Sequence, residues 1–480
     1  MMLVRPLAAA VAALSITACA SVGPDYRRPG IAVPDAYSAG AAAGEIPDAW
    51  WTLFGDAELD RLVGEALAAN QDIALAAARV DEARALAGVA RADRFPQVSA
   101  GASGSRTKLS QDTATVPPGF ELERDAVRAT GTLSFELDFW GRLRRAHEAA
   151  RAELLATEEG RRNVRLAVVS EVATAWFDRL ALDRQLAIAR ETLVTRNESV
   201  RLQRLRFDAG SISELDLSQA EAELAATEAT VPQLERTVRQ TENRLAVLLG
   251  RVGGEIPRAG SLVELKVPEI PAGLPSELLA RRPDVVGAEQ QLVAANARIG
   301  VARAALFPSI TLTGYAGSES QQLADLFASG TSVWQAALGL VQPIFNAGKL
   351  RRQVDAAEAR ERQALASYAK TVETAFAEVE DALVARSTGA EERAALARQV
   401  AALARARRLA VLRYEAGDAS YLEVLDAERN LFRADLELVR AQRGEAGAAV
   451  ALFRALGGGW PLAAAPDTAS PETAPAGASR

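Results

Sequence analysis

The sequence predicts a mostly helical protein with a few membrane strands, arranged as two repeats of one architecture. The first observation is a helical hairpin that occurs twice: Gly210 and Gly417 each follow a long helical stretch, and 417 − 210 = 207. The second is a set of alternating segments after two Phe-Pro turns, at residues 95–96 and 307–308. The third is composition, since 49% of residues are hydrophobic but only 5% are aromatic, which favours long, closely packed helices.

The N-terminus has the form of a secretory leader, with Arg5 before an apolar run at 7–14. Residues 16–19 (Ile-Thr-Ala-Cys) resemble a bacterial lipobox, in which the cysteine is acylated. We therefore expect a signal peptide over 1–18 and a lipidated arm over 19–56 that begins at Cys19. Ala20 rather than Asp follows, which in such lipoproteins implies delivery to the outer membrane. The alternative is a chance cysteine in a leader that is cleaved elsewhere.

The first repeat is predicted over 57–250 and the second over 276–457, joined by a linker at 251–275. The first repeat opens with a helix from Ala57 to about Arg94, which the Phe-Pro turn ends. From Arg142 to Arg206 there is no proline, so a helix there would extend about 98 Å. The linker is punctuated by Pro and Gly, and Lys266 lies in a possible short strand. The tail at 458–480 is rich in Ala and Pro, and we expect it to be disordered.

Two segments in each repeat alternate between apolar and polar residues, near 98–103, 132–139, 309–313 and 334–340. A period of two indicates strands, and about ten residues is the length of a tilted membrane strand. The polar connections near 108–125 and 317–331 are typical of outer loops. No segment after the leader has the roughly 18 apolar residues of a membrane helix. The alternative is a small soluble sheet against the helices.

Each hairpin has a predicted helix stop followed by a helix start. Gly210 and Gly417 reach the left-handed conformation at low cost, so each ends a helix. Ser213 with Asp216, and Ser420 with Glu423, have the spacing of capping boxes that start the returning helices. The returning helices carry apolar residues at steps of seven, which predicts left-handed coiled-coil packing. These positions are Leu217, Leu224, Val231, Val238 and Leu245 in the first repeat, and Val424, Leu431, Leu438 and Leu452 in the second.

Enzyme chemistry has little support in the composition. One histidine, His147, and one cysteine exclude a zinc site or a histidine-based triad, so no metal or cofactor is expected. No Gly-Lys-Ser/Thr phosphate-binding loop occurs. The net charge of −7 has no basic patch of the kind that binds nucleic acid.

The motifs together resemble the TolC-like outer-membrane efflux lipoproteins, the outer-membrane subunits of resistance-nodulation-division pumps. They are the lipobox followed by residues 22–26, the Arg-Arg-Pro-Asp-Val of 281–285, the paired Phe-Pro turns, and residues 414–417 and 425–429. The resemblance implies a homotrimer with a periplasmic helical tunnel. Four strands are too few to close a barrel, and 3 × 4 = 12 strands agrees with a trimeric barrel. It also implies a passive duct that exports drugs or other small toxic molecules, with a periplasmic adaptor and an inner-membrane pump as partners.

In this family the periplasmic end is held shut by ionic and hydrogen-bonded contacts near the second hairpin. Arg413, Tyr414, Asp426 and Arg429 match the gate positions, and Asp216 of the first hairpin matches only by its place. The alternative for each is an ordinary solvated helix residue. For Asp426 and Arg429, three residues apart, a pair within one helix is the specific competitor.

Two other functions are alternatives to an efflux duct. An exit duct for type I protein secretion would have the same fold, but such ducts generally lack the lipid. A coiled-coil lipoprotein that tethers the envelope would not need four alternating segments at matching positions.

Overall fold

The computed structural model describes residues 21–34, 36–37, 46–110, 121–257, 260–271 and 275–459. The predicted signal peptide, Cys19 and residues 460–480 of the predicted tail lie outside these ranges. Among the helices that are described, none combines the length and the apolar character needed to cross a membrane.

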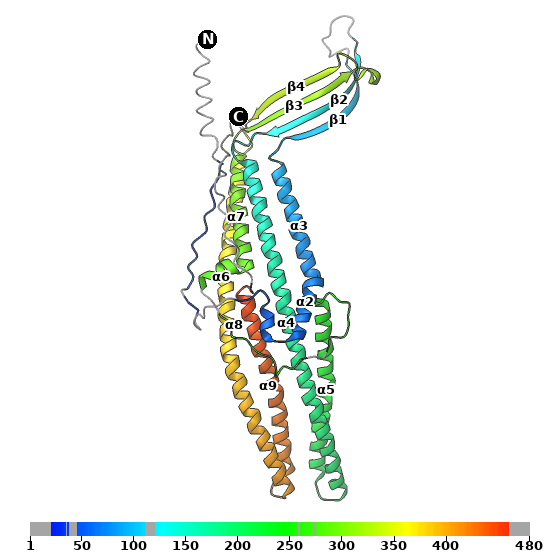
Figure 1. Cartoon of the computed structure of the whole chain (residues 1–480), viewed down its shortest axis with the longest axis vertical. Coiled ribbons are helices and arrows are strands. Elements are labelled where there is room, and N and C mark those ends of the chain that lie inside the picture. The colour runs from blue at the N-terminus through cyan, green and yellow to red at the C-terminus, as the bar shows by residue number, and fades with distance from the viewer. Residues whose placement is uncertain are drawn as a thin grey trace, which may run out of the picture. The chain divides into compact units, whose positions relative to one another are not determined.

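Two long helical hairpins contain most of the residues that the structure places in helices (Figure 1). Helices α4 (Arg142–Asp208) and α8 (Lys349–Glu415) have 67 residues each. Each is followed by a helix of 35 residues, α5 (Glu214–Leu248) and α9 (Tyr421–Ala455). Because 349 − 142 and 421 − 214 both equal 207, the predicted duplication is confirmed at the level of whole elements.

The single helix predicted from Ala57 to Arg94 is wrong, because the chain breaks at Asn70. Helix α2 (Ala57–Ala69) ends there and α3 (Gln71–Ala92) begins. The Asn70 Oδ1 accepts hydrogen bonds from the backbone N–H groups of Asp72 and Ile73, at 2.9 and 3.2 Å. Its Nδ2 donates to the carbonyl of Leu248 at 2.8 Å, so this side chain both starts α3 and holds it to the end of α5.

The shorter elements complete the repeats. They are η1 (Trp50–Phe54), α6 (Pro275–Arg281), α7 (Pro283–Ala304) and η2 (Leu323–Asp325). Helices α3 and α7 both have 22 residues and are offset by 283 − 71 = 212. The possible strand at Lys266 is wrong, since the described parts of the linker, 251–257 and 260–271, form turns and irregular backbone.

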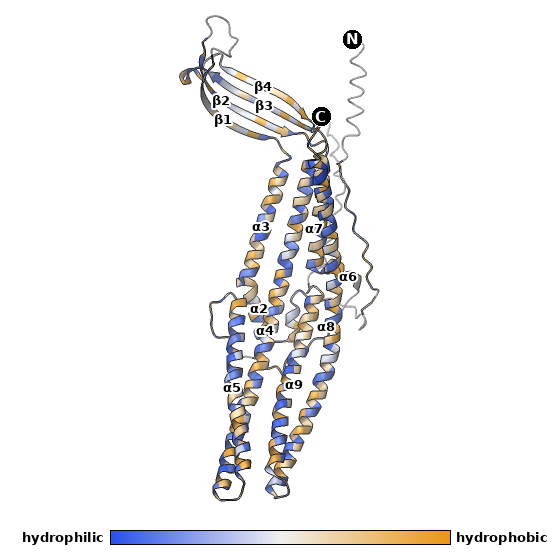
Figure 2. Cartoon of the chain, turned by 180° about the vertical axis from the view of Figure 1, so that it is seen from behind, coloured by the Kyte–Doolittle hydropathy of each residue, from blue (hydrophilic) through white to orange (hydrophobic). Residues whose placement is uncertain are grey.

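The four predicted strands are confirmed as one antiparallel sheet in the order β1-β2-β3-β4. They are β1 (Gln97–Lys108), β2 (Glu123–Glu136), β3 (Ser309–Ser320) and β4 (Ser332–Val341). The pairing of β2 with β3 joins the two repeats, with Thr132 opposite Tyr315. Apolar and polar residues alternate along the strands (Figure 2). Apolar side chains of the strands are exposed in the single chain, as at Val98 (76%) and Trp334 (79%). Strands β1 and β4 are the two edges of the sheet and have no further strand partner among the described residues.

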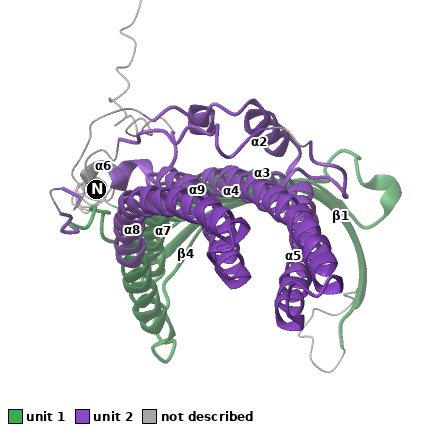
Figure 3. Cartoon of the chain, turned by 90° about the horizontal axis from the view of Figure 1, so that it is seen from below, with its two compact units in different colours: residues 1–30, 79–158, 287–368 green, residues 31–78, 159–286, 369–480 purple. Residues whose placement is uncertain are grey.

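The chain divides into two compact units that do not follow the sequence repeats (Figure 3). The first unit is 1–30, 79–158 and 287–368 and includes the sheet with the adjoining helix ends. The second is 31–78, 159–286 and 369–480 and includes both hairpin tips. Each unit therefore draws on both halves of the duplication.

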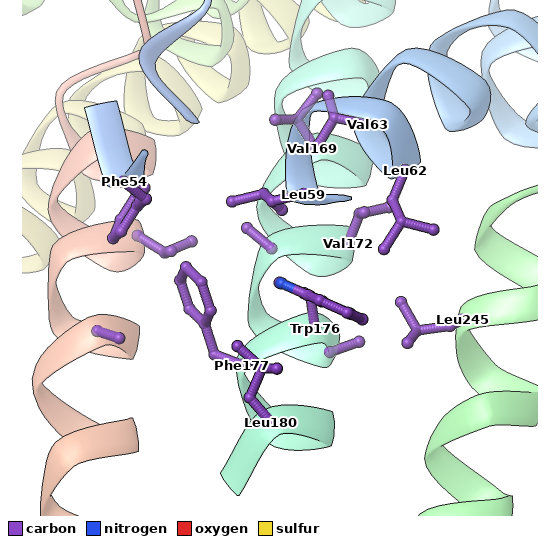
Figure 4. Close-up of a cluster of buried hydrophobic side chains, with 14 of the residues drawn as sticks. Phe54, Leu59, Leu62, Val63, Val169, Val172, Trp176, Phe177, Leu180 and Leu245 are labelled. Carbon is purple, nitrogen blue, oxygen red and sulfur yellow. The ribbon is translucent and has the colours of Figure 1, made fainter. Parts of the chain in front are cut away.

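The largest apolar core lies in the second unit, where aromatic side chains pack at the bases of the hairpins (Figure 4). Trp50 stacks on Phe453 with ring centroids 4.8 Å apart. Trp176 is buried, and its Nε1 donates to the Asp56 Oδ2 at 2.9 Å. Aromatic side chains of η1, α4 and α9 thus meet in this core.

Candidate functional site

The tips of the two hairpins have the same backbone. Gly210 and Gly417 have φ of 72° and 84°, the left-handed conformation that glycine adopts without strain. The Ser211 N–H donates to the carbonyl of Arg206 at 2.8 Å, and the Asp418 N–H donates to the carbonyl of Arg413 at 2.9 Å. Both helices therefore end in a Schellman motif. An added Cβ would meet no atom within 4 Å at either glycine, so backbone conformation alone selects this residue.

The caps of the returning helices differ. At the first hairpin the Asp216 N–H donates to the Ser213 Oγ at 3.3 Å, and the Ser213 N–H donates to the Asp216 Oδ2 at 3.2 Å. This is a complete capping box. The capping box predicted at Ser420 and Glu423 is wrong, because the Ser420 side chain makes no cap hydrogen bond.

Glu423 is engaged by an arginine of its own hairpin instead. The Arg413 Nη1 donates to the Glu423 Oε2 at 2.9 Å, and its Nη2 donates to the carbonyl of Asp418 at 3.2 Å. Arg413 therefore ties the end of α8 to the start of α9 across the turn. Both side chains are exposed, at 56% and 47% of their area.

Tyr414 contacts the other hairpin. The Arg206 Nη1 donates to the Tyr414 hydroxyl at 2.6 Å, and the Arg206 guanidinium lies 5.1 Å from the centre of the same ring. The Gln203 side chain also hydrogen-bonds this hydroxyl, with Nε2 at 3.2 Å. Tyr414 and Tyr421 pack at 5.4 Å between ring centroids. Burial, followed by the nearby Glu428, raises the pKa of Tyr421.

A small apolar core fills the space between the hairpins at this level. It consists of Val200, Ala220, Tyr421, Val424 and Leu425, with Leu224, Ala410, Val411 and Tyr414 packed against it. Because both hairpins contribute, the polar contacts at their tips are set on a packed apolar base.

Arg429 makes the second contact between the hairpins. Its Nη2 and Nε donate to the Glu223 Oε1 of α5 at 2.6 and 2.9 Å. Glu223 also pairs with Arg196, whose Nη1 lies 3.0 Å from the Glu223 Oε2. Arg196 is buried and also donates to the hydroxyl of Thr227. Burial lowers the pKa of Arg196, and the charge of Glu223 opposes that shift.

The pair of Asp426 with Arg429 within one helix, considered from the sequence, is absent among the described residues. Arg429 is directed to Glu223, and Asp426 accepts a hydrogen bond from the Asn430 Nδ2 at 3.0 Å. Of the five predicted gate residues, the structure thus places Tyr414 and Arg429 between hairpins and Arg413 within its own. Asp216 belongs to a cap, and Asp426 lies exposed on α9.

Sequence reasoning missed the first-hairpin partners of these contacts, Arg206, Gln203, Glu223 and Arg196. One signal was present for Arg206, because 413 − 207 = 206 makes it the repeat equivalent of Arg413. Over the described residues no cluster of His, Cys, Asp and Glu could hold a metal ion. The arrangement is therefore one of hydrogen bonds and ion pairs between two long helical hairpins.

Three comparisons bear on this chain. The family model described as outer membrane efflux protein matches residues 62–251 and 274–458. The solvent efflux pump outer membrane protein SrpC of Pseudomonas putida is 38% identical over 461 residues, covering 94% of this chain and 97% of SrpC. The cation efflux system protein CusC of Escherichia coli O6:H1 is 38% identical over 457 residues, covering 93% and 97%. The structure of the open state of the MtrE outer membrane channel of Neisseria gonorrhoeae aligns with a TM-score of 0.82 and 32% identity, covering 92% of this chain and 98% of that one.

Proposed function

The chain belongs to the outer membrane efflux protein family, and we propose that its paired hairpin tips form the periplasmic gate of the duct. As a member of this family it is an exit component of an efflux pump in the outer membrane, and not an enzyme. Type I protein secretion is not favoured, since the relatives serve efflux pumps.

The substrates are proposed only as a class. SrpC is a solvent efflux protein and CusC a cation efflux protein, yet both are 38% identical to this chain. Overall identity therefore does not discriminate between substrates. We therefore propose export of varied small toxic molecules, selected by the inner-membrane pump rather than by the duct.

The duct is proposed to be a homotrimer. One chain supplies four strands, with β1 and β4 as unpaired edges, and 3 × 4 = 12 strands would close a barrel. Unpaired backbone edges are strongly disfavoured in lipid, so closure requires strands from other copies. The exposed apolar residues of the strands would then face lipid. A lipid at Cys19 would add an anchor, and a periplasmic adaptor and a resistance-nodulation-division pump would complete the assembly.

The observation that carries the gate proposal is the pair of contacts between hairpins. Arg206 with Tyr414, and Glu223 with Arg429, join helices that are 208 and 206 residues apart in the chain. Opening by displacement of the second hairpin would break both contacts together. Partly exposed pairs of this kind contribute about 0–1 kcal/mol each, so the closed state depends on several acting together. Modest binding energy from an adaptor would then suffice to shift the equilibrium.

The other predicted gate residues have distinct proposed roles. Arg413 fixes the turn that presents Tyr414, and Asp216 fixes the start of the opposite helix. Asp426 is exposed on α9 and would be repeated around the axis of a trimer. The structure of the similar channel MtrE is described as an open state. That description supports the proposal that a duct of this family can be open or closed.

The test is single-channel conductance in planar bilayers. The variant that combines Tyr414→Phe with Arg429→Gln removes the hydroxyl that accepts from Arg206 and the charge that pairs with Glu223. We expect conductance to rise several-fold, with little change in trimer stability. Arg433→Gln is the matched control, since Arg433 is exposed on the same helix and has no ion pair among the described residues. Wild-type conductance in the double variant would place the gate elsewhere.

A further inference from the structure

The helix ends beside the sheet carry exposed arginines in the first repeat. Arg91 and Arg94 lie at the end of α3, directly before β1, and Arg144 and Arg151 lie at the start of α4, shortly after β2. All four belong to the first compact unit together with the sheet. Figure 1 shows α3 and α4 reaching the strands from the same side.

These four arginines form no ion pair with any described residue. Neighbouring arginines use the nearby carboxylates: Arg142 pairs with Glu136, and Arg145 pairs with Asp25 and Glu148. Asp138 is engaged by the backbone N–H of Arg144 at 2.8 Å. Asp93 is the one carboxylate within 91–94, and it is exposed. Asp93 and Asp138 are thus the local carboxylates, and the four arginines outnumber them.

His147, the only histidine of the chain, reports on this charge. Its pKa is lowered by burial first and then by Arg94, Arg151 and Arg91. Arg91 and Arg94 at the end of α3 and Arg151 of α4 thus act on one ring. We define the basic cluster as these three residues together with Arg144, which lies on α4 three residues before His147.

The second repeat has the same excess of cations at its own junction. Lys349 and Arg351, at the start of α8, are exposed and have no ion pair within the described part of the chain. The first turns of α4 and α8 contain no acidic residue. Cations at a helix N-terminus oppose the macrodipole, so these charges are placed where the helix itself disfavours them. An anion from outside the chain would offset that repulsion.

Exposed aromatic and aliphatic side chains accompany these cations. Phe95 is 57% exposed beside Arg94, and Ile344 and Phe345 are each 89% exposed shortly before Lys349. Trp140 stacks on Phe307 at 4.8 Å, at the two junctions between sheet and helix. Aromatic residues next to a membrane-spanning sheet are typical of the boundary between hydrocarbon and headgroups. Basic residues at that depth meet lipid phosphates.

We propose that the basic cluster binds the headgroups of anionic phospholipids in the leaflet that faces the periplasm. This inference rests on the proposed placement of the sheet in the outer membrane, with the helices in the periplasm. Four arginines without ion pairs among the described residues lie near the exposed side chains of Phe95, Ile344 and Phe345. This combination fits a phospholipid whose phosphate contacts the arginines and whose acyl chains lie against the sheet. The contact would fix the depth of the sheet in the bilayer.

The full-length protein is purified in detergent and freed of bound phospholipid. It is then titrated with dioleoyl phosphatidylglycerol or dioleoyl phosphatidylethanolamine, and native mass spectrometry counts the phospholipids bound. The test variant changes all four cluster arginines to Gln. The control variant makes the same change at Arg236, Arg398, Arg405 and Arg408, which are exposed, lie in the second unit and have no ion pair among the described residues.

Wild-type and control proteins should bind phosphatidylglycerol more tightly than phosphatidylethanolamine. The test variant should lose at least about ten-fold in phosphatidylglycerol affinity, since each basic residue near a membrane surface contributes about five-fold. In wild type, phosphatidylglycerol should also raise the pKa of His147, measured by NMR on histidine-labelled protein, because bound phosphate neutralises the surrounding arginines.

Equal affinity of wild type for the two lipids, or unchanged phosphatidylglycerol binding by the test variant, would overturn the inference. Channel conductance separates it from the proposed function. The test variant should conduct as wild type does in planar bilayers, because its gate is intact. If the wild-type protein prefers phosphatidylglycerol but forms no channel, the proposed duct function fails and the lipid inference stands.

Discussion

The two hairpins have the same backbone but different side-chain contacts at their tips. Both have helices of 67 and 35 residues and end in a glycine with positive φ. In the first, Asp216 caps the returning helix, so Arg206 is free to reach Tyr414 of the second hairpin. In the second, the equivalent arginine, Arg413, holds Glu423 within its own turn.

The two copies of the duplication share their helix ends but differ in the side chains at the hairpin tips. Helix ends depend on local backbone and on one glycine, so they are retained in both copies. Two of the side chains that join the hairpins are replaced in the other copy: Glu223 corresponds to Asn430, and Tyr414 corresponds to Phe207, at the offset of 207. The contact between the two copies is therefore asymmetric, and the proposed gate would open where that contact breaks.

The largest expected effect concerns Glu223 and its repeat equivalent. Glu223→Ala leaves the buried Arg196 without its carboxylate and also frees Arg429, so the free energy of local opening should fall by about 3 kcal/mol. Amide hydrogen exchange at the tips of α5 and α9 should then quicken by about 100-fold. Asn430→Ala is the matched change and should cost less than about 0.5 kcal/mol. Equal acceleration in both variants would mean that the hairpins are not held asymmetrically.

A smaller effect is expected at the two caps. Ser213→Ala removes the hydroxyl that accepts from the Asp216 N–H and should destabilise the start of α5 by about 1 kcal/mol. Ser420→Ala should change the start of α9 very little, because the Ser420 side chain makes no cap bond. Exchange rates of the first-turn amides measure both. Comparable losses at the two serines would contradict the difference between the caps.

Local signals in the sequence predicted most of the fold. The duplication, the four strands and the turns at Gly210 and Gly417 follow from spacing, period and backbone preference, which depend on neighbouring residues. The break at Asn70 was missed although asparagine is a favoured N-cap, because the apolar pattern continues across it. The capping box at Ser420 was wrong because Arg413, ten residues before Glu423, competes for that carboxylate.

Only the second-hairpin residues of the candidate site could be predicted, because only that hairpin carries the family motif. Tyr414 and Arg429 lie within it, whereas their partners Arg206 and Glu223 lie more than 200 residues earlier. Which side chains meet between two long helices depends on the rotation of each helix and on the core at Val200 and Val424. No local pattern specifies that rotation.

The proposed gate requires that contact between the hairpins at Glu223 and Arg429 keep the duct closed. Cysteines at both positions, joined by a flexible bifunctional thiol reagent with a reducible linkage, test it in one protein. When reduced, the variant lacks the ion pair and should show high single-channel conductance. When cross-linked, it should return to low conductance, and reduction should reverse the change. The same conductance in both states, with cross-linking verified by mass spectrometry, would contradict the account.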